Sequence, residues 1–172
     1  MVKQNALQLD RVVFIGRTYF EYIRMFDLGG YDLKRGAVLD CAAGPSSFTA
    51  EVRKQGCEAI ACDALYGCQV ETLKDKGAKD IEHTFQKVDD VPHLYVWKYY
   101  RDRREIIALR HKALECFVND YPSGLKDGRY VRAELPQLPF PDRTFSLCCR
   151  ATFCFCMATG WILIFMFLRC SK

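Results

Sequence analysis

The fold is decided by the stretch Gly36-Ala37-Val38-Leu39-Asp40-Cys41-Ala42-Ala43-Gly44-Pro45-Ser46-Ser47-Phe48. An apolar run ends on the carboxylate of Asp40, small residues surround Gly44, and a periodic segment begins at Phe48. This order predicts a buried strand, a tight turn and the start of a helix. Small residues allow a ligand to approach the backbone closely, and open α/β sheets bind ligands at the carboxyl ends of their strands. The turn is therefore a candidate binding site.

The turn departs from the known phosphate-binding fingerprints. Ala42, Gly44 and Ser46 stand at alternate positions where a G-x-G-x-x-G motif would carry glycines, and no G-x-x-x-x-G-K-[ST] motif follows. The carboxylate of Asp40 at the mouth of the turn would also repel a diphosphate. We expect a ligand with a cationic or hydroxyl-rich end, and the alternative is an ordinary strand–turn–helix without a ligand.

A second apolar run, from Ala59 to Cys62, ends on Asp63, which lies 23 residues after Asp40. In a βαβ unit an acidic residue about 20 residues beyond the first turn binds ribose hydroxyls. A carboxylate suits a vicinal diol because it accepts two hydrogen bonds at once. Asp63 is therefore a candidate ribose ligand.

Hydrophobic periodicity and turn signals predict the remaining elements. Residues 1–35 form a lead-in with an amphipathic helix over 17–25, and Gly29 and Gly30 end it. The other predictions are helices over 48–54, 70–87 with a break at Gly77, and 93–121, a loop over 122–128, and strands over 129–133 and 147–155. In the helix over 93–121, Arg110 stands within an apolar stripe that runs from Ile106 to Val118.

The composition is that of a globular protein with one domain: 172 residues, of which 50% are hydrophobic and 27% charged. The net charge of +4 is too small to imply nucleic-acid binding by itself. Ten cysteines lack the C-x-x-C pairing of zinc sites. They predict free thiols in a reducing compartment, and with no visible signal peptide we expect a cytoplasmic, metal-free protein.

The segment from Val38 to Phe48 resembles motif I of the class I S-adenosylmethionine-dependent methyltransferases, with Gly44 as the retained middle glycine. Asp63 stands at the place of motif II, and the segment around Leu138-Pro139-Phe140-Pro141 resembles the linker before the fourth strand. The resemblance implies an α/β fold with a Rossmann-like, doubly wound, mostly parallel sheet. The family sheet has seven strands in the order 3-2-1-4-5-7-6, so the sheet of this chain is expected to be incomplete at its C-terminal side.

The resemblance also implies where S-adenosylmethionine would bind. Asp40 and the turn from Ala42 to Ser46 would face the methionine end, Asp63 the ribose, and the segment from Glu134 to Leu135 the adenine. No residue is nominated as catalytic, and the methyl acceptor is unknown. The implied cofactor-binding residues are Asp40, Cys41, Ala42, Ala43, Gly44, Ser46, Asp63, Ala64, Glu134 and Leu135.

The expected organisation is a methyltransferase-like cofactor-binding domain over 1–156, with a basic helical insertion at 93–121, and an atypical hydrophobic tail over 157–172. Between Lys98 and Lys112 six basic residues face two acidic ones, beside several aromatic residues. This segment suits an anionic acceptor, a single-stranded nucleic acid or an anionic membrane surface. The favoured alternative is a solvated helix face whose aromatic residues pack inward.

The end of the chain leaves three hypotheses open. Eighteen residues without a charge separate Arg150 from Arg169, which reaches the lower limit of a membrane span, and a buried strand is the favoured alternative. The chain is then a methyltransferase impaired by its shortened sheet, a non-catalytic cofactor-binding or interaction module, or a membrane protein anchored through 151–168.

Overall fold

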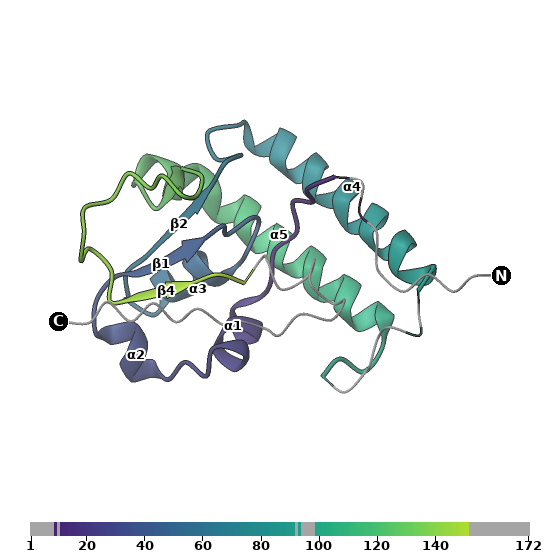
Figure 1. The fold of residues 1–172 in the computed structure, drawn as a ribbon, viewed down its shortest axis with the longest axis horizontal. Coiled ribbons are helices and arrows are strands. Elements are labelled where there is room, and N and C mark those ends of the chain that lie inside the picture. Colours follow the sequence, from purple (N-terminus) through teal and green to yellow (C-terminus); the bar gives the residue numbers. More distant parts are fainter. Residues whose placement is uncertain (1–8, 10, 92, 94–98, 152–172) are drawn as a thin grey trace.

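The computed structural model describes residues 9, 11–91, 93 and 99–151. Within these ranges the chain forms an α/β fold around a four-stranded, all-parallel sheet in the order β3-β2-β1-β4 (Figure 1). β2 and β3 are added on one side of β1, and the chain then returns to add β4 on the other side of β1. The strand order therefore reverses at the boundary between β1 and β4. The strands are β1 (Val38–Cys41), β2 (Ala59–Asp63), β3 (Tyr130–Arg132) and β4 (Leu147–Cys149).

The strand register brings the two predicted acidic strand ends to one edge of the sheet. Val38 pairs with Ala59, and Cys41 pairs with Cys62, so the turn after β1 lies beside Asp63 at the end of β2. All four residues of β1 are buried, as expected for a central parallel strand. The two strands predicted before the acidic ends Asp40 and Asp63, and the strand predicted over 129–133, are confirmed as β1, β2 and β3. The strand predicted over 147–155 begins as expected, but β4 ends at Cys149, and residues from 152 onward lie outside the described part.

Five helices accompany the sheet in the described ranges. The helices predicted over 17–25, 48–54 and 70–87 are confirmed. The short helix α2 was not predicted, because consecutive glycines such as Gly29 and Gly30 usually end a helix. Gly29 is instead the N-cap of α2, which begins at Gly30. The helices are α1 (Tyr19–Met25), α2 (Gly30–Lys34), α3 (Phe48–Lys54), α4 (Val70–Asp89) and α5 (Arg103–Lys126).

Helix α5 differs most from its prediction. It begins at Arg103, where Asp102 caps it through the backbone N–H of Glu105, and not at residue 93. It also continues through the predicted loop at 122–124, so that part of the prediction is wrong. Buried Tyr121 and the close approach of Tyr130 to Gly124 hold this last part of α5 against β3, which outweighs the helix-breaking tendency of Pro122.

The predicted break at Gly77 is also wrong, because α4 is continuous from Val70 to Asp89. Gly77 instead marks a close approach of α4 to α5: a methyl group at this position would lie 2.7 Å from Cδ1 of Leu114. The two helices lie side by side along much of their length (Figure 1).

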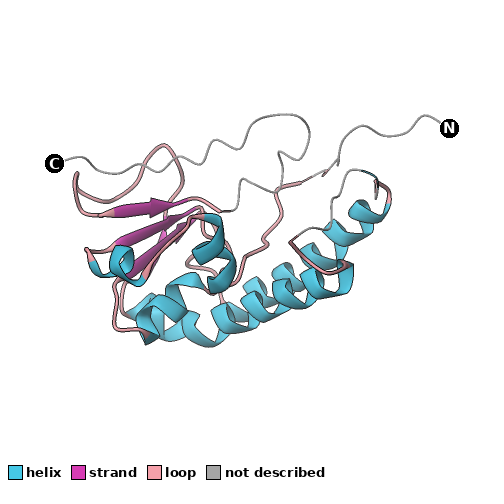
Figure 2. Ribbon diagram, turned by 90° about the horizontal axis from the view of Figure 1, so that it is seen from below, coloured by secondary structure: helices cyan, strands magenta, loops and turns pink. Residues whose placement is uncertain are grey.

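The two faces of the sheet are covered differently. One face packs against the helices in two hydrophobic clusters, which include Val38, Ala61 and Tyr130. The other face, with Leu39, Cys41 and Cys62, packs against half-buried side chains of the segment 133–145. Figure 2 shows the long helices on one side of the strands and this loop on the other. Among the described residues the second face carries no helix.

None of the helices in the described ranges is long and apolar enough to cross a bilayer. The predicted tail at 157–172 lies outside these ranges, as does all of 151–168 except Ala151.

Candidate functional site

Asp63 lies at the carboxyl edge of the sheet and joins the ends of β1 and β2. Its Oδ2 atom accepts a hydrogen bond from the backbone N–H of Gly44 at 3.0 Å, and its Oδ1 atom accepts one from the N–H of Leu65 at 3.0 Å. Burial raises the pKa of the Asp63 carboxyl, although both N–H groups oppose that shift. The side chain is only half-buried, and a carboxylate offers about four acceptor positions. Two acceptor positions therefore remain for a ligand.

Asp40, at the end of β1, points into the helix-covered side of the core. It is fully buried, and its two carboxyl oxygens accept the hydroxyl of Tyr22 at 3.0 and 2.9 Å. The hydroxyl of Ser46 donates to Oδ2 at 2.9 Å. Burial raises the pKa of Asp40 from 3.8 to about 7, because the hydrogen bonds only partly offset the loss of water. Asp40 thus fixes the base of the turn through Ser46.

The turn itself is tied into the protein by several hydrogen bonds. Gly44 has a φ of 57°, a left-handed conformation that favours glycine. Besides the bond to Asp63, its carbonyl accepts the hydroxyl of Tyr66 at 2.6 Å, and the N–H of Ala43 donates to the carbonyl of Cys62 at 3.0 Å. Ala43, Gly44, Pro45 and Ser46 are all buried.

The turn is buried because residues 14–18, which we call the N-terminal strap, lie across it. A methyl group on Gly16 would collide with the carbonyl oxygen of Pro45, so only glycine permits this approach. The N–H of Ser47 donates to the carbonyl of Arg17 at 3.0 Å. Ile15 also contacts the turn, since a methyl group on Gly44 would lie 3.3 Å from its carbonyl oxygen.

Both ends of the strap are fixed. At one end the N–H of Phe14 donates to buried Asp80 at 2.8 Å, and the Phe14 ring packs edge-on against Phe117. At the other end Thr18 caps α1 in a capping box with Glu21.

A buried ion pair holds the middle of the strap and α1 against α5. Nη1 of Arg110 donates to Oε2 of Glu21 at 2.9 Å and to the carbonyl of Gly16 at 3.1 Å. Nη2 of Arg110 pairs with the other carboxylate oxygen, which the hydroxyl of Tyr100 also contacts. Burial acts to raise the pKa of Glu21, but the hydrogen bonds and charge of Arg110 outweigh it and lower this pKa to about 2. The hydrophobic periodicity places Arg110 in an apolar stripe, but it does not indicate the ion pair with Glu21.

The structure therefore separates the predicted cofactor residues into two groups. The covered group comprises Asp40, Cys41, Ala43, Gly44 and Ser46, all of which are buried. The accessible group is half-buried or exposed, and comprises Ala42, Asp63, Ala64, Glu134 and Leu135.

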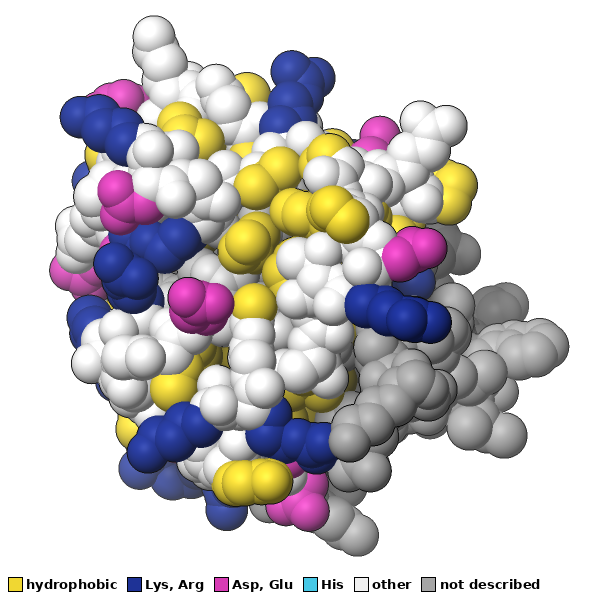
Figure 3. Space-filling view, turned by 90° about the vertical axis from the view of Figure 1, so that its left-hand side faces the viewer, with side chains coloured by type: hydrophobic (Ala, Val, Ile, Leu, Met, Phe, Trp, Pro, Cys, Tyr) yellow, Lys and Arg dark blue, Asp and Glu magenta, His cyan; other side chains and the backbone are white. Residues whose placement is uncertain are grey.

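Glu134 and Leu135 lie in the loop that follows β3. The N–H of Ala133 donates to the backbone carbonyl of Asp63 at 3.3 Å, which brings the start of this loop to the end of β2. The charge of Glu134 contributes to the raised pKa of Asp63. Leu135 is 40% exposed, so the loop offers apolar surface to solvent. Figure 3, which faces the side on which this loop runs, shows hydrophobic side chains gathered near the middle of that face.

Three of the six basic residues between Lys98 and Lys112 pair with acidic side chains. Arg103 pairs with Asp89 at 2.6 Å, Arg110 is buried with Glu21, and Arg101 contacts Asp102 at 3.4 Å. Tyr100 packs inward, whereas Tyr99 is 47% exposed. Residues 95, 97 and 98 of this segment lie outside the described residues.

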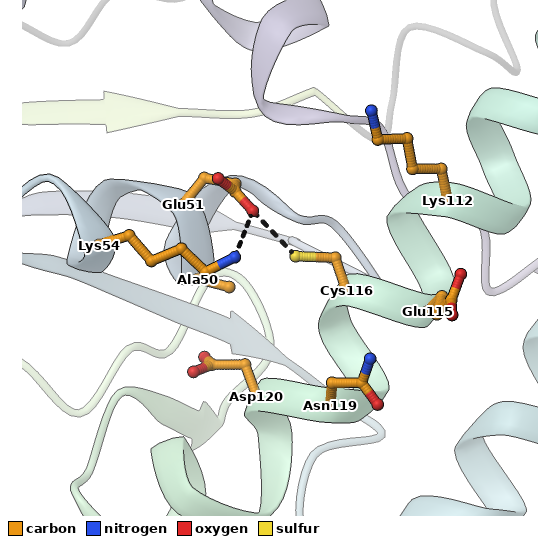
Figure 4. A pocket seen from close by; sticks show the side chains of 8 residues that line it. All are labelled: Ala50, Glu51, Lys54, Lys112, Glu115, Cys116, Asn119 and Asp120. Carbon is orange, nitrogen blue, oxygen red and sulfur yellow. Dashed lines mark hydrogen bonds and ion pairs between the residues drawn. The ribbon is translucent and has the colours of Figure 1, made fainter.

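A cavity of about 380 Å³ lies away from the predicted site, between α3 and α5 (Figure 4). One carboxylate oxygen of Glu51 accepts both the ammonium of Lys54 at 2.7 Å and the thiol of Cys116 at 3.3 Å. Burial and the Glu51 carboxylate raise the pKa of the Cys116 thiol to about 11, so the thiol is protonated at neutral pH. This cavity does not contain a reactive nucleophile.

The seven cysteines of the described ranges are free thiols, most of them buried. Within the same ranges no group of three or more histidine, cysteine or acidic side chains is arranged to hold a metal ion.

Comparison with known proteins gives one relative to report. The chain is 30% identical over 142 residues to an uncharacterized protein of Methanocaldococcus jannaschii. The match covers 82% of this chain and 63% of the relative, so the chain spans less than two thirds of that protein's length. No family model matches the chain, and no solved structure matches it significantly.

Proposed function

We propose that the chain is a Rossmann-like, S-adenosylmethionine-dependent methyltransferase-like protein that binds its cofactor at the carboxyl edge of β1 and β2. The observation that carries this proposal is the hydrogen bond from the Gly44 N–H to Oδ2 of Asp63, at 3.0 Å. It places the turn after β1 against an acidic side chain that keeps acceptor positions open to solvent. The strand order β3-β2-β1-β4 agrees with the first four strands expected for such a sheet.

The proposed roles follow from this geometry. Asp63 accepts the ribose hydroxyls, Ala64 leaves room beside it, and the loop containing Glu134 and Leu135 borders the base. Methyl transfer from a sulfonium needs mainly positioning of the acceptor, so the proposal requires no catalytic acid or base. The acceptor is not assigned.

A second candidate, the non-catalytic binding module, is favoured by one observation: the N-terminal strap buries the turn from Ala43 to Ser46, where the methionine end of the cofactor would lie. Both candidates share the ribose site at Asp63. They differ in whether methyl transfer follows binding.

Calorimetric titration of the full chain with S-adenosylmethionine tests the shared site. Asp63→Asn keeps the shape but removes the charge, and the loss of a charged acceptor should weaken binding about 10- to 100-fold. Asp75→Asn, the same change at an exposed position of α4, is the matched control and should leave affinity unchanged. Equal affinity of the wild type and Asp63→Asn would refute the ribose assignment.

A further inference from the structure

The carboxyl edge of the sheet offers a ligand two unlike halves. At the end of β2, Asp63 is half-buried, and Ala64, Glu134 and Leu135 are exposed. At the end of β1, the turn is buried under the N-terminal strap. A ligand that occupies the edge as it stands meets the first half and not the second.

The accessible half has the groups that a nucleoside requires. The unused acceptor positions of the Asp63 carboxylate suit a vicinal diol, because each hydroxyl can donate one hydrogen bond. Leu135 supplies exposed apolar surface for a planar base in the loop whose start, at Ala133, is hydrogen-bonded to the backbone of Asp63. Ala64, the next residue after Asp63, is exposed and adds only a methyl group.

Three donors of the covered half that would suit an amino-acid moiety are already bound within the protein. The N–H of Gly44 is bound to Asp63, the hydroxyl of Ser46 to Asp40, and the N–H of Ser47 to the strap. A zwitterionic methionine end would need such donors and acceptors, since its charges lose their hydration when they are buried. The carboxylate of Asp40, which would attract the ammonium group, is fully buried beneath Tyr22 and Ser46.

We infer that, with the strap on the turn, the site selects nucleosides: it holds the adenosine part of a ligand and gains nothing from the amino-acid part. This inference rests on the proposed function, because it concerns the same site. It adds the chemical class of ligand that the closed site prefers, and it names Gly16 as the residue that permits closure.

Titration of the full-length wild-type chain with adenosine, S-adenosylmethionine and free methionine tests the inference. Adenosine and S-adenosylmethionine should bind within about threefold of each other, and methionine should not bind measurably. If the turn held the amino-acid end, each charged hydrogen bond would add about 10- to 100-fold to the affinity. S-adenosylmethionine binding more than about 30-fold tighter than adenosine would therefore overturn the inference and leave the proposed function intact. Absence of binding by both adenosine compounds would overturn the proposed function together with the inference.

Gly16→Ala provides an independent test, because its methyl group collides with Pro45 only while the strap lies on the turn. Lifting the strap should raise the preference for S-adenosylmethionine over adenosine at least tenfold and leave adenosine affinity unchanged. Gly30→Ala is the control, since a methyl group there meets nothing within 4 Å, and its preference should equal that of the wild type. Circular dichroism establishes that both variants are folded. A folded Gly16→Ala protein with the wild-type preference would overturn the role of the strap.

Discussion

Asp40→Asn should remove a loss of stability that the wild-type protein undergoes as pH rises from about 4 to 7. The carboxyl of Asp40 is fully buried, and burial raises its pKa from 3.8 to about 7. Below about pH 4 the carboxyl is protonated in both the folded and the unfolded chain. Between pH 4 and pH 7 the unfolded chain releases this proton while the folded chain keeps it, so the free energy of unfolding falls as pH rises. Above pH 7 the Asp40 carboxyl is ionised in both the folded and the unfolded chain, and the free energy of unfolding no longer falls on its account.

The size of this effect follows from the shift in pKa. Each unit corresponds to about 1.4 kcal/mol, so a rise of about three units costs the folded state about 4 kcal/mol above pH 7. Over the practical range from pH 5 to pH 8 the wild type should lose about 2–3 kcal/mol relative to Asp40→Asn. The asparagine is neutral at every pH and has nearly the same shape, and its amide can still bond the hydroxyls of Tyr22 and Ser46.

Urea unfolding of both proteins at pH 5, 6, 7 and 8 measures this difference directly. The difference between wild type and Asp40→Asn cancels the contributions of the other titrating groups, and Asp75→Asn should show no comparable trend. A stability difference that stays constant between pH 5 and pH 8 would show that Asp40 is not the buried, proton-retaining group described here.

Three further outcomes are expected. Glu21→Gln should destabilise the chain by about 3–5 kcal/mol in urea unfolding at pH 7, because it leaves the buried charge of Arg110 unpaired. The double variant Glu21→Gln with Arg110→Met should recover at least half of this loss of stability. No recovery in the double variant would contradict the pairing of Glu21 with Arg110. The wild type should also lose stability as pH falls from about 4.5 towards 2, where Glu21 becomes protonated in the folded state, and this loss should be absent from Glu21→Gln. Gly77→Ala should cost about 1–3 kcal/mol because its methyl group crowds Leu114, whereas a variant as stable as wild type would show that α4 and α5 adjust freely.

The central strands and the position of Asp63 could be predicted from the sequence because both depend on local patterns. A buried parallel strand is a continuous apolar run, and β1 and β2 each end on an acidic residue that the pattern locates without knowledge of the rest. The spacing from Asp40 to Asp63 is that of one βαβ unit, so the two ends had to meet at the same edge.

The contacts that close the turn could not be predicted in this way. The segment from Phe14 to Arg17 has no helical or strand period, and its position depends on partners such as Asp80 and Arg110, 66 and 94 residues away along the chain. One signal was present: a single arginine in the apolar stripe of a helix predicts a buried ion pair, since a buried guanidinium needs a carboxylate. The pattern placed Arg110 in the core but could not identify Glu21 as its partner.

The same logic explains the errors at glycine and proline. Single-residue tendencies predict interruptions at Gly77 and Pro122, because both residue types are disfavoured within helices. In the folded chain Gly77 lies where α4 approaches Leu114, and Pro122 follows Tyr121, whose burial fixes the end of α5. Tertiary packing outweighs a local penalty of a few kcal/mol at most, so these positions report contacts that the sequence does not show.

The contacts along the strap set how often the turn can open. Phe14 is fixed by Asp80 and Phe117, and Thr18 by the capping box with Glu21. Between them, Arg110 donates a hydrogen bond to the carbonyl of Gly16, and Ser47 donates one to the carbonyl of Arg17. The side chain of Arg17 also donates to the carbonyl of Ala151 and the hydroxyl of Tyr100 at 3.4 Å, and pairs with Glu21 at 3.6 Å. When residues 15–17 move outward, water can replace the two backbone hydrogen bonds at a net cost of about 0.5–1.5 kcal/mol each.

The ion pair of Glu21 with Arg110 need not break during this movement, because Glu21 belongs to α1 and not to the strap. The two backbone bonds alone would place the open arrangement at about 1–15% of molecules, and the contacts of Arg17 and the burial of Ile15 lower this fraction further. A ligand can shift this equilibrium only by as much as it prefers the open turn. Adenosine, which meets only the accessible half of the edge, has no such preference, whereas a ligand with an amino-acid end gains one only after the strap has moved. Gly16→Ala acts on the same balance from the protein side, since its collision with Pro45 exists in the closed arrangement alone.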